Sequence, residues 1–316
     1  MNTVAKLKCG VIGVGYLGRF HAQKYQLIER AQLVGVYDRD SARASVVAQE
    51  LSVKSFKSLE ELVSQVEAVT ISATTSSHYE LAKFCLERGI HVHVEKPMTS
   101  TSKQGEELVA IAKKNSCKLQ VGHIERFNPA FQVARDRLNR PLFIECHRLA
   151  PFNPRGSDVT VVLDLMIHDI DVVLALVRSK VTSVSAVGAA VLTPTVDIAN
   201  ARIEFASGAI ANLTASRVSQ LAMRKFRVFE KNQYLSFDFG SGEVKLATKS
   251  EEGAKPGNLP IVTETWNLQK GDALLEETKA FVEAVTQNQP CIVAGEDGLV
   301  ALRLAEQISS EIQKRI

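Results

Sequence analysis

The stretch KCGVIGVGYLG, residues 8–18, places three glycines directly after a short apolar run. In a dinucleotide-binding turn, Gly13 would make the tight bend, Gly15 would let the backbone approach a pyrophosphate, and Gly18 would let the next helix pack closely on the strand. That helix would direct its free N–H groups at the phosphate. Asp38 follows twenty residues after Gly18, at the end of the next apolar run, where a carboxylate can bind the ribose hydroxyls. These residues predict a dinucleotide-binding turn.

The choice of cofactor depends on Asp38 and Arg39, which are adjacent in the sequence. The Asp38 carboxylate favours NAD because its charge repels the 2′-phosphate of NADP, whereas Arg39 could bind that phosphate. We interpret Arg39 as a solvated surface charge, and we expect NAD. Tyr16 and Leu17, inside the glycine turn, complete the expected cofactor contacts of this segment.

Short apolar runs alternate with helical patterns over the first 122 residues. The runs are rich in Val and Ile, as strands covered on both faces should be, and they lie at residues 8–12, 33–37, 69–72, 91–94 and 118–121. Helical patterns lie between them at residues 41–51, 59–66, 79–88 and 103–114. This α/β alternation predicts a parallel, doubly wound sheet, so we expect an NAD-binding Rossmann domain over residues 1–122.

The pattern changes after about residue 125, where strand-like segments follow one another without intervening helices. They lie at residues 143–149, 181–187, 199–205, 209–215, 224–228, 234–237 and 243–247. Ser207-Gly208 predicts a hairpin turn between two of them, and the polar residues 251–258 are typical of a loop. Helical patterns near residues 273–285 and 297–314 close the chain. We expect an antiparallel sheet in a second domain over residues 123–316, whose last helices could pack back on the first domain.

Composition and charge restrict the class of protein. The 316 residues are 45% hydrophobic and carry a net charge of +3, which is too weak to indicate a nucleic-acid-binding face. The five cysteines are far apart and form no CxxC pair, so we expect reduced thiols in a cytoplasmic protein, without disulfides or a zinc site. The apolar run at residues 159–177 contains three Asp, and each one near its centre would cost about 2.5–3.5 kcal/mol in a bilayer. We therefore expect no membrane span.

A second segment with catalytic potential is Glu95-Lys96-Pro97, which follows the predicted strand at residues 91–94. Ligands of open α/β sheets bind beyond the carboxyl ends of the strands. A lysine at this position could polarise a substrate oxygen or transfer a proton. The alternative is a surface lysine before a proline turn.

A third segment contains Asp164, His168 and Asp171, which would share one face of an otherwise apolar helix. Burying polar groups without partners is costly, and an imidazole oriented by a carboxylate suits the removal of a hydroxyl proton. A structural His–Asp pair and a metal site are the alternatives. We expect no metal.

Together and in this order, these three segments resemble the Gfo/Idh/MocA oxidoreductases. Further matches are Thr74 with His78, residues 121–122 and residues 126–129, and the resemblance extends over essentially the whole chain. It implies a C-terminal α+β domain with a large open antiparallel sheet, which binds substrate and mediates assembly into a homodimer or homotetramer.

The resemblance also implies roles for individual residues. Three would be catalytic, beside the substrate: Lys96, Asp164 and His168. Three more would contact the cofactor, the last of them near its nicotinamide half: Thr74, His78 and Glu95.

Around the expected site, residues 122–129, 154–158 and 162–169 look most like enzymes that oxidise UDP-N-acetylglucosamine at carbon 3. Those enzymes supply a 3-keto nucleotide sugar to an aminotransferase, on the route to diamino-sugar lipid A. The resemblance implies an NAD-dependent dehydrogenase of a UDP-sugar, with Arg126, Asn128 and Arg155 binding the substrate. Two alternatives stay open: dehydrogenation of a free polyol such as myo-inositol, and a non-enzymatic, cofactor-binding regulator.

Overall fold

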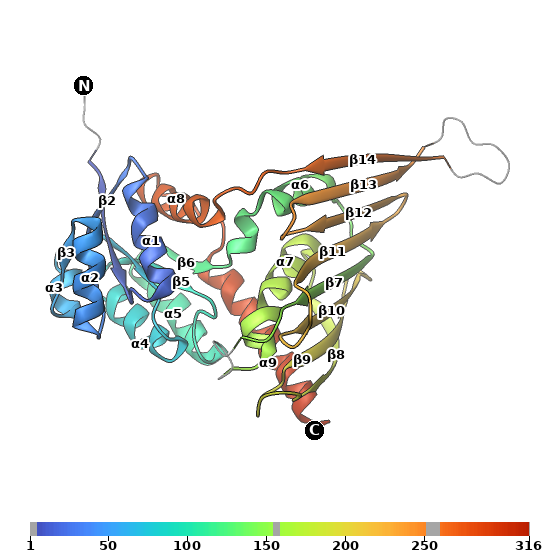
Figure 1. Cartoon of the computed structure of the whole chain (residues 1–316), viewed down its shortest axis with the longest axis horizontal. Helices are drawn as coiled ribbons and strands as arrows, with labels where there is room; N and C mark the ends of the chain where they lie inside the picture. The colour runs from blue at the N-terminus through green and yellow to red at the C-terminus, as the bar shows by residue number, and fades with distance from the viewer. Residues whose placement is uncertain (1–4, 154–158, 251–259, 316) are drawn as a thin grey trace. The chain divides into compact units, whose positions relative to one another are not determined.

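The computed structural model describes residues 5–153, 159–250 and 260–315. The chain divides into two compact units (Figure 1). Unit 1 comprises residues 1–124 and 272–302, and unit 2 comprises residues 125–271 and 303–316. A segment near the C-terminus therefore contributes to the N-terminal unit.

The sheet of unit 1 is entirely parallel, with the strand order β3-β2-β1-β4-β5-β6. Its strands are β1 (Leu7–Ile12), β2 (Ala31–Tyr37), β3 (Lys54–Ser55), β4 (Ala68–Ile71), β5 (His91–Glu95) and β6 (Leu119–Gly122). The helices are α1 (Tyr16–Gln26), α2 (Ser41–Leu51), α3 (Leu59–Val63), α4 (Thr75–Leu86), α5 (Ser102–Lys114), α8 (Ala273–Thr286) and the first part of α9 (Gly295–Gln313).

This sheet is buried on both of its faces. Every residue of β4 is buried, as expected for a parallel strand with helices above and below it. Helices α1 and α2 contact each other, and α4 contacts α5. Because β1 pairs with β2 on one side and β4 on the other, the strand order reverses there, and the loops after β1 and β4 flank the crevice that binds a dinucleotide in this fold. The predicted doubly wound parallel sheet is confirmed.

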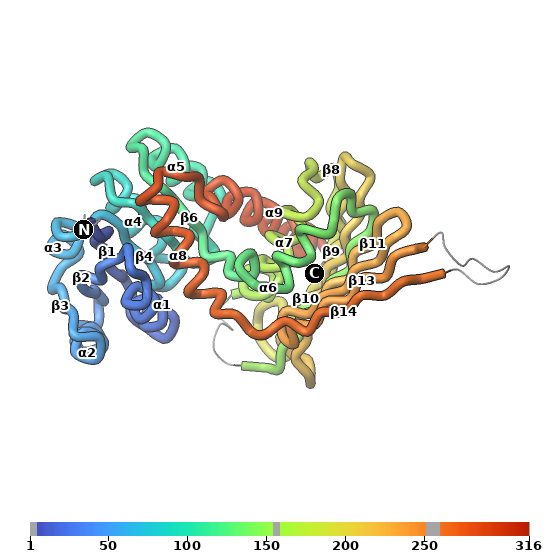
Figure 2. The backbone as a smooth tube through the Cα atoms, turned by 90° about the horizontal axis from the view of Figure 1, so that it is seen from above, coloured from blue at the N-terminus to red at the C-terminus, as the bar shows by residue number. Residues whose placement is uncertain are grey.

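Helix α8 completes the core of unit 1. The chain returns from β14 as α8, drawn in red-orange in Figure 2, and α8 contacts α1. Phe281 and Val282 of α8 are fully buried in the same apolar cluster as Ala22 and Tyr25 of α1. An apolar face of α8, about 260 residues later in the sequence, thus covers the helix that follows the glycine turn.

The sheet of unit 2 has the order β14-β13-β12-β11-β7-β10-β9-β8. Its strands are β7 (Phe143–Leu149), β8 (Val181–Ala189), β9 (Ile198–Phe205), β10 (Ile210–Ser216), β11 (Met223–Glu230), β12 (Gln233–Asp238), β13 (Glu243–Lys249) and β14 (Ile261–Asn267). A 3₁₀ turn (Ile124–Phe127) leads into α6 (Pro129–Arg137), and a π-helical turn (Val162–Met166) leads into α7 (Ile167–Val177). Figure 1 shows α6 and α7 on the same face of the sheet, where α7 contacts β7 and β10, and α6 contacts β12 and β13.

The second sheet confirms the predicted fold class and adds one detail. Neighbouring strands are antiparallel except β7 and β10, which pair in parallel. The predicted hairpin between β9 and β10 is present, and Gly208 supplies the positive φ of 85° that its turn requires. The predicted loop at residues 251–258 lies outside the described residues. Among the residues that the structure describes, no helix is both long and apolar enough to cross a bilayer.

Candidate active site

The glycine turn between β1 and α1 has the geometry that a dinucleotide needs. Gly13 has a φ of 83°, and a Cβ at Gly18 would lie 1.9 Å from the carbonyl oxygen of Gly13. A Cβ at Gly15, in contrast, would meet no atom within 4 Å. Helix α1 begins after Gly15 without a side-chain cap, so its first N–H groups face this open space. The turn therefore fits a bound pyrophosphate.

Asp38 lies directly after β2 and is held beside the glycine turn. Its Oδ2 accepts a hydrogen bond from the backbone N–H of Val14 (2.8 Å), and its Oδ1 accepts one from Asp40 (2.9 Å). The guanidinium of Arg43, which the sequence analysis did not single out, lies 3.5 Å from the same carboxylate, whereas Arg39 is exposed. The Asp38 carboxylate is thus held beside the glycine turn, and its binding of the ribose stays a prediction.

Thr74 and His78 lie in the loop after β4 and at the start of α4. Thr74 is the N-cap residue of α4. His78 is buried, with Nδ1 2.9 Å from the carbonyl oxygen of Pro97 and Nε2 3.1 Å from that of Ala73. Burial is the main cause that lowers the pKa of His78, and a neutral imidazole donates to one of these carbonyls at a time. His78 therefore connects the loops after β4 and β5.

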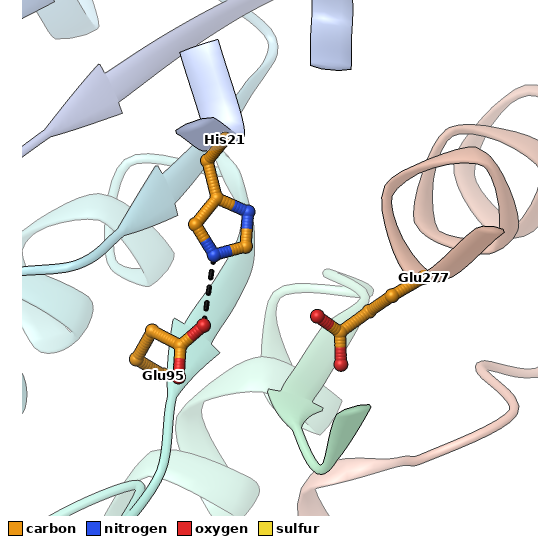
Figure 3. A group of neighbouring side chains, drawn as sticks. All are labelled: His21, Glu95 and Glu277. Atoms are coloured by element: carbon orange, nitrogen blue, oxygen red, sulfur yellow. Dashed lines mark hydrogen bonds and ion pairs between the residues drawn. The ribbon is translucent and has the colours of Figure 1, made fainter. Parts of the chain in front are cut away.

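Glu95 ends β5, and Lys96 follows it before a cis Pro97. Glu95 Oε1 lies 2.8 Å from Nε2 of His21, a residue of α1 that the sequence analysis did not select. Glu277 of α8 faces the same pair (Figure 3), and the nearest ligand-type atoms of the three side chains lie within 4.8 Å of one another. This geometry could admit a metal ion, but the short His21–Glu95 contact is that of a hydrogen bond, and we assign no metal here.

In unit 2, Asp164 lies within the π-helical turn and His168 in the first turn of α7. The segment is helical, as the shared face requires, but Asp164 lies in a π-helical turn and not in a regular α-helix; such π turns often occur at functional sites. Both side chains are half-buried, whereas the neighbouring Asp169 and Asp171 are fully buried. The polar stripe of α7 thus divides into a more accessible pair and two buried carboxylates.

The buried carboxylates of α7 have arginine partners. Asp169 binds Arg148 of β7, which also binds Glu125. Asp171 accepts two hydrogen bonds from the guanidinium of Arg126, at 2.7 and 3.0 Å. Arg126, a predicted substrate ligand, is therefore engaged with α7.

Of the other two predicted substrate residues, the structure describes only Asn128. Asn128 is the N-cap residue of α6, where its side chain accepts a hydrogen bond from Ala130. Arg155 lies outside the described residues. Substrate binding by Arg126, Asn128 and Arg155 stays a prediction.

A cavity beside Asn128 is lined by two further cationic side chains that the sequence analysis missed. Its lining includes Asn128, Phe239, Arg224 and Lys270. Arg224 pairs in register with Arg148, and its charge acts on Asp169, next to His168. The cavity therefore lies on the side of unit 2 that carries α7. No sequence signal marks these two residues, because Arg224 lies near the start of β11 whereas Lys270 lies between β14 and α8, and they form no local motif.

The parallel sheet with this strand order and glycine turn defines a dinucleotide-binding protein of the Rossmann class. Residues 7–123 match the model of the oxidoreductase family with an NAD-binding Rossmann fold, and residues 132–234 match the GFO/IDH/MocA C-terminal domain. The chain belongs to the Gfo/Idh/MocA family of oxidoreductases, and its cofactor is NAD.

Two relatives are similar over almost their whole length. The UDP-N-acetylglucosamine 3-dehydrogenase of Acidithiobacillus ferrooxidans is 38% identical over 308 residues, 97% of each chain. A structure of that protein superposes with a TM-score of 0.92 and covers 98% of this chain and 99% of that one. The myo-inositol 2-dehydrogenase of Thermotoga maritima is 26% identical and covers 98% of this chain and 97% of that protein.

Proposed function

We propose that the protein oxidises the 3-hydroxyl of UDP-N-acetylglucosamine to a ketone, with NAD as the oxidant. The observation that carries this proposal is the 38% identity, over 97% of both chains, to a UDP-N-acetylglucosamine 3-dehydrogenase. The inositol dehydrogenase of similar coverage is 26% identical, so a free polyol such as myo-inositol is the second candidate.

In the proposed reaction the substrate loses a hydride from carbon 3 and a proton from the hydroxyl on that carbon. NAD, when bound, supplies the hydride acceptor. His168 accepts the hydroxyl proton, Asp164 orients the imidazole, and Lys96 donates a hydrogen bond to the same oxygen. The reverse assignment, with Lys96 as the base, uses the same three side chains.

Replacement of the two proton-handling residues tests these roles. Lys96→Met and His168→Asn should each lower turnover by about 10²–10⁴-fold, the usual contribution of a positioned acid or base. NAD affinity should be retained, because neither residue belongs to the glycine turn. Near-normal turnover in either variant would remove that residue from the mechanism.

The UDP moiety requires cations that bind a diphosphate. Arg155 is the first candidate, and the cavity that contains Arg224 and Lys270 offers two more in unit 2. Arginine matches diphosphate oxygens with two parallel hydrogen bonds. We propose that these side chains make the protein selective for a nucleotide sugar over a free polyol, which has no diphosphate.

Titration of UDP itself tests this assignment. Arg155→Ala and Arg224→Ala should each weaken UDP binding by about 1.5–3 kcal/mol, the scale of a charged hydrogen bond. The matched control is Arg202→Ala, because Arg202 forms an exposed pair with Glu204 on β9, and it should leave UDP affinity unchanged. No UDP binding by the unmodified protein would favour the polyol.

The cellular setting is part of the same proposal. A 3-keto nucleotide sugar is a substrate for an aminotransferase, so we place the protein before such an enzyme in the synthesis of diamino-sugar lipid A. We also propose that it acts in the cytoplasm as a homodimer or homotetramer. The resemblance of residues 122–129 and 162–169 to enzymes of that route supports this placement.

A further inference from the structure

His21 is a polar residue on the buried face of α1. The buried residues of this helix are Gly18, His21, Ala22 and Tyr25, a stripe with helical spacing. The His21 side chain is fully buried, and a buried polar group requires a hydrogen-bond partner. Glu95 supplies that partner, because an ionised carboxylate is an acceptor and Nε2 of His21 can donate to it across 2.8 Å.

The Glu95 carboxylate is confined on two further sides. It faces Gly122 of β6, where a Cβ would lie 3.0 Å from the carboxyl carbon of Glu95. Its Oε2 accepts a hydrogen bond from the backbone N–H of Lys96 (3.3 Å). The group that His21 holds is thus also bonded to the backbone of the proposed catalytic lysine.

Charged and titratable groups face Glu95 from several elements: His21 from α1, His93 from β5, Lys96 after β5 and Glu277 from α8. Burial lowers the pKa of His93 to about 3, so that imidazole is neutral. Burial alone would favour the neutral acid of Glu95, but the hydrogen bond and charge of His21, with a contribution from the charge of Lys96, lower its pKa. Glu95 is therefore an anion at neutral pH.

The position of this anion gives it a role toward the cofactor. Asp38 marks the expected adenosine side of the strand-order reversal, so the nicotinamide half would lie over the ends of β4 and β5. The oxidised nicotinamide ring is positively charged and the reduced ring is neutral. A fixed carboxylate at the end of β5 therefore favours the oxidised form.

We propose that His21 is a positioning residue of this dehydrogenase: it holds the Glu95 carboxylate in place as a fixed anion that selects oxidised over reduced cofactor. This inference rests on the proposed position of the nicotinamide half and not on the identity of the sugar. Cofactor binding therefore tests it without any substrate.

Two amide replacements at residue 21 form a matched pair. The amide nitrogen of His21→Gln can reach the position of Nε2 and donate to Glu95, whereas that of His21→Asn corresponds to Nδ1 and cannot. Dissociation constants for NAD⁺ and NADH would be measured separately by calorimetry, from about pH 5 to 9. The Asn variant should bind NAD⁺ about tenfold more weakly at neutral pH, with NADH affinity nearly unchanged, and the Gln variant should behave like the unmodified protein.

The pH dependence of NAD⁺ affinity is a second measurement, and a merely structural role of His21 would not change it. Without its donor, Glu95 should have a higher pKa, so NAD⁺ affinity in the Asn variant should fall as the pH is lowered across this range. In the unmodified protein it should stay flat. At the acidic end of this range, adding Glu95→Gln to the Asn variant should cause little further loss of NAD⁺ affinity, because Glu95 of the Asn variant is then already protonated.

Several results would overturn the proposal. Equal changes in NAD⁺ and NADH affinity, no change in either, or equal behaviour of Asn and Gln would show that His21 does not act through the charge of Glu95. If the Asn variant does not fold, His21→Leu replaces it, since it also lacks a donor and suits a buried site. A stoichiometric metal ion retained after incubation with Zn²⁺ and lost in His21→Asn would assign His21 to a cation and also overturn the proposal.

Discussion

Gly15 and Gly18 lie three residues apart in the same turn, yet added methyl groups would meet different surroundings. At Gly18 the methyl would overlap the Gly13 carbonyl oxygen, while at Gly15 it would enter open space. Gly15 has a φ of −64° and a ψ of −158°, an extended conformation, so no positive φ requires a glycine there. The two glycines therefore serve different purposes, one for packing and one for the ligand.

Alanine substitution separates these purposes. Gly18→Ala should destabilise the fold by about 1–3 kcal/mol, the usual cost of overpacking. Gly15→Ala should change the free energy of unfolding by less than about 0.5 kcal/mol but weaken NAD binding by about tenfold or more, because the methyl occupies the space of the pyrophosphate. Thermal unfolding and calorimetry measure the two effects. Retained NAD affinity in Gly15→Ala would contradict the assignment of this turn to the pyrophosphate.

At this scale, sequence reasoning predicts residues that belong to local motifs. Asp38 and the three glycines follow from one strand–turn–helix pattern, and the structure places them together. His21 and Arg224 were missed because their partners, Glu95 and the cavity residues, lie on other elements. For His21 a weak signal exists, since it occupies the buried stripe of a helix where an apolar residue is usual.

Helix α7 packs on the sheet partly through buried charged side chains. Arg148 of β7 binds Asp169 of α7 and Glu125, and all three side chains are nearly inaccessible to solvent. Burial raises the pKa of Asp169 despite the adjacent guanidinium. This triad fixes the helix that carries His168 to the sheet.

Arg148→Met should destabilise the protein by about 3–5 kcal/mol at neutral pH, because it leaves two buried carboxylates without their cation. Loss of the cation raises the folded-state pKa of Asp169 further, so the folded state takes up a proton more readily than the unfolded chain. The deficit should therefore shrink as the pH falls toward about 4. Denaturant unfolding at several pH values measures this loss of stability.

Arg227→Met is the control for this prediction. Arg227 pairs with Glu145 in a more exposed ion pair, so the loss of stability should stay below about 1 kcal/mol. A deficit independent of pH would contradict the triad's role.

Helices and strands were predicted correctly where apolar residues recur with one regular spacing along the whole element. The α2 helix and strand β7 have the predicted bounds, because their apolar residues recur regularly. Strand β14 was missed because its residues are mostly exposed and show no alternation, and β3 is too short to form a pattern. The π-helical turn at Val162–Met166 depends on tertiary contacts, which periodicity does not encode.

For the whole molecule, the division into units is not simply sequential. Helix α8 belongs to the N-terminal unit, where Phe281 packs against His93 as well as α1. A helical pattern at residues 273–285 predicts a helix but not its destination, since an apolar face can cover any complementary surface. Assembly into a homodimer or homotetramer likewise stays a prediction, because a strand or helix pattern does not say which surface another copy would cover.

Transfer of a labelled hydrogen from carbon 3 of the sugar tests the central claim most directly. The purified protein would be incubated with NAD⁺ and UDP-N-acetylglucosamine carrying deuterium at carbon 3, and both products would be examined by mass spectrometry. Our account predicts that the deuterium appears in the reduced cofactor and that the nucleotide sugar becomes lighter by the label and one hydroxyl hydrogen. Reduction of NAD⁺ by myo-inositol with no transfer from the labelled UDP-sugar would contradict it.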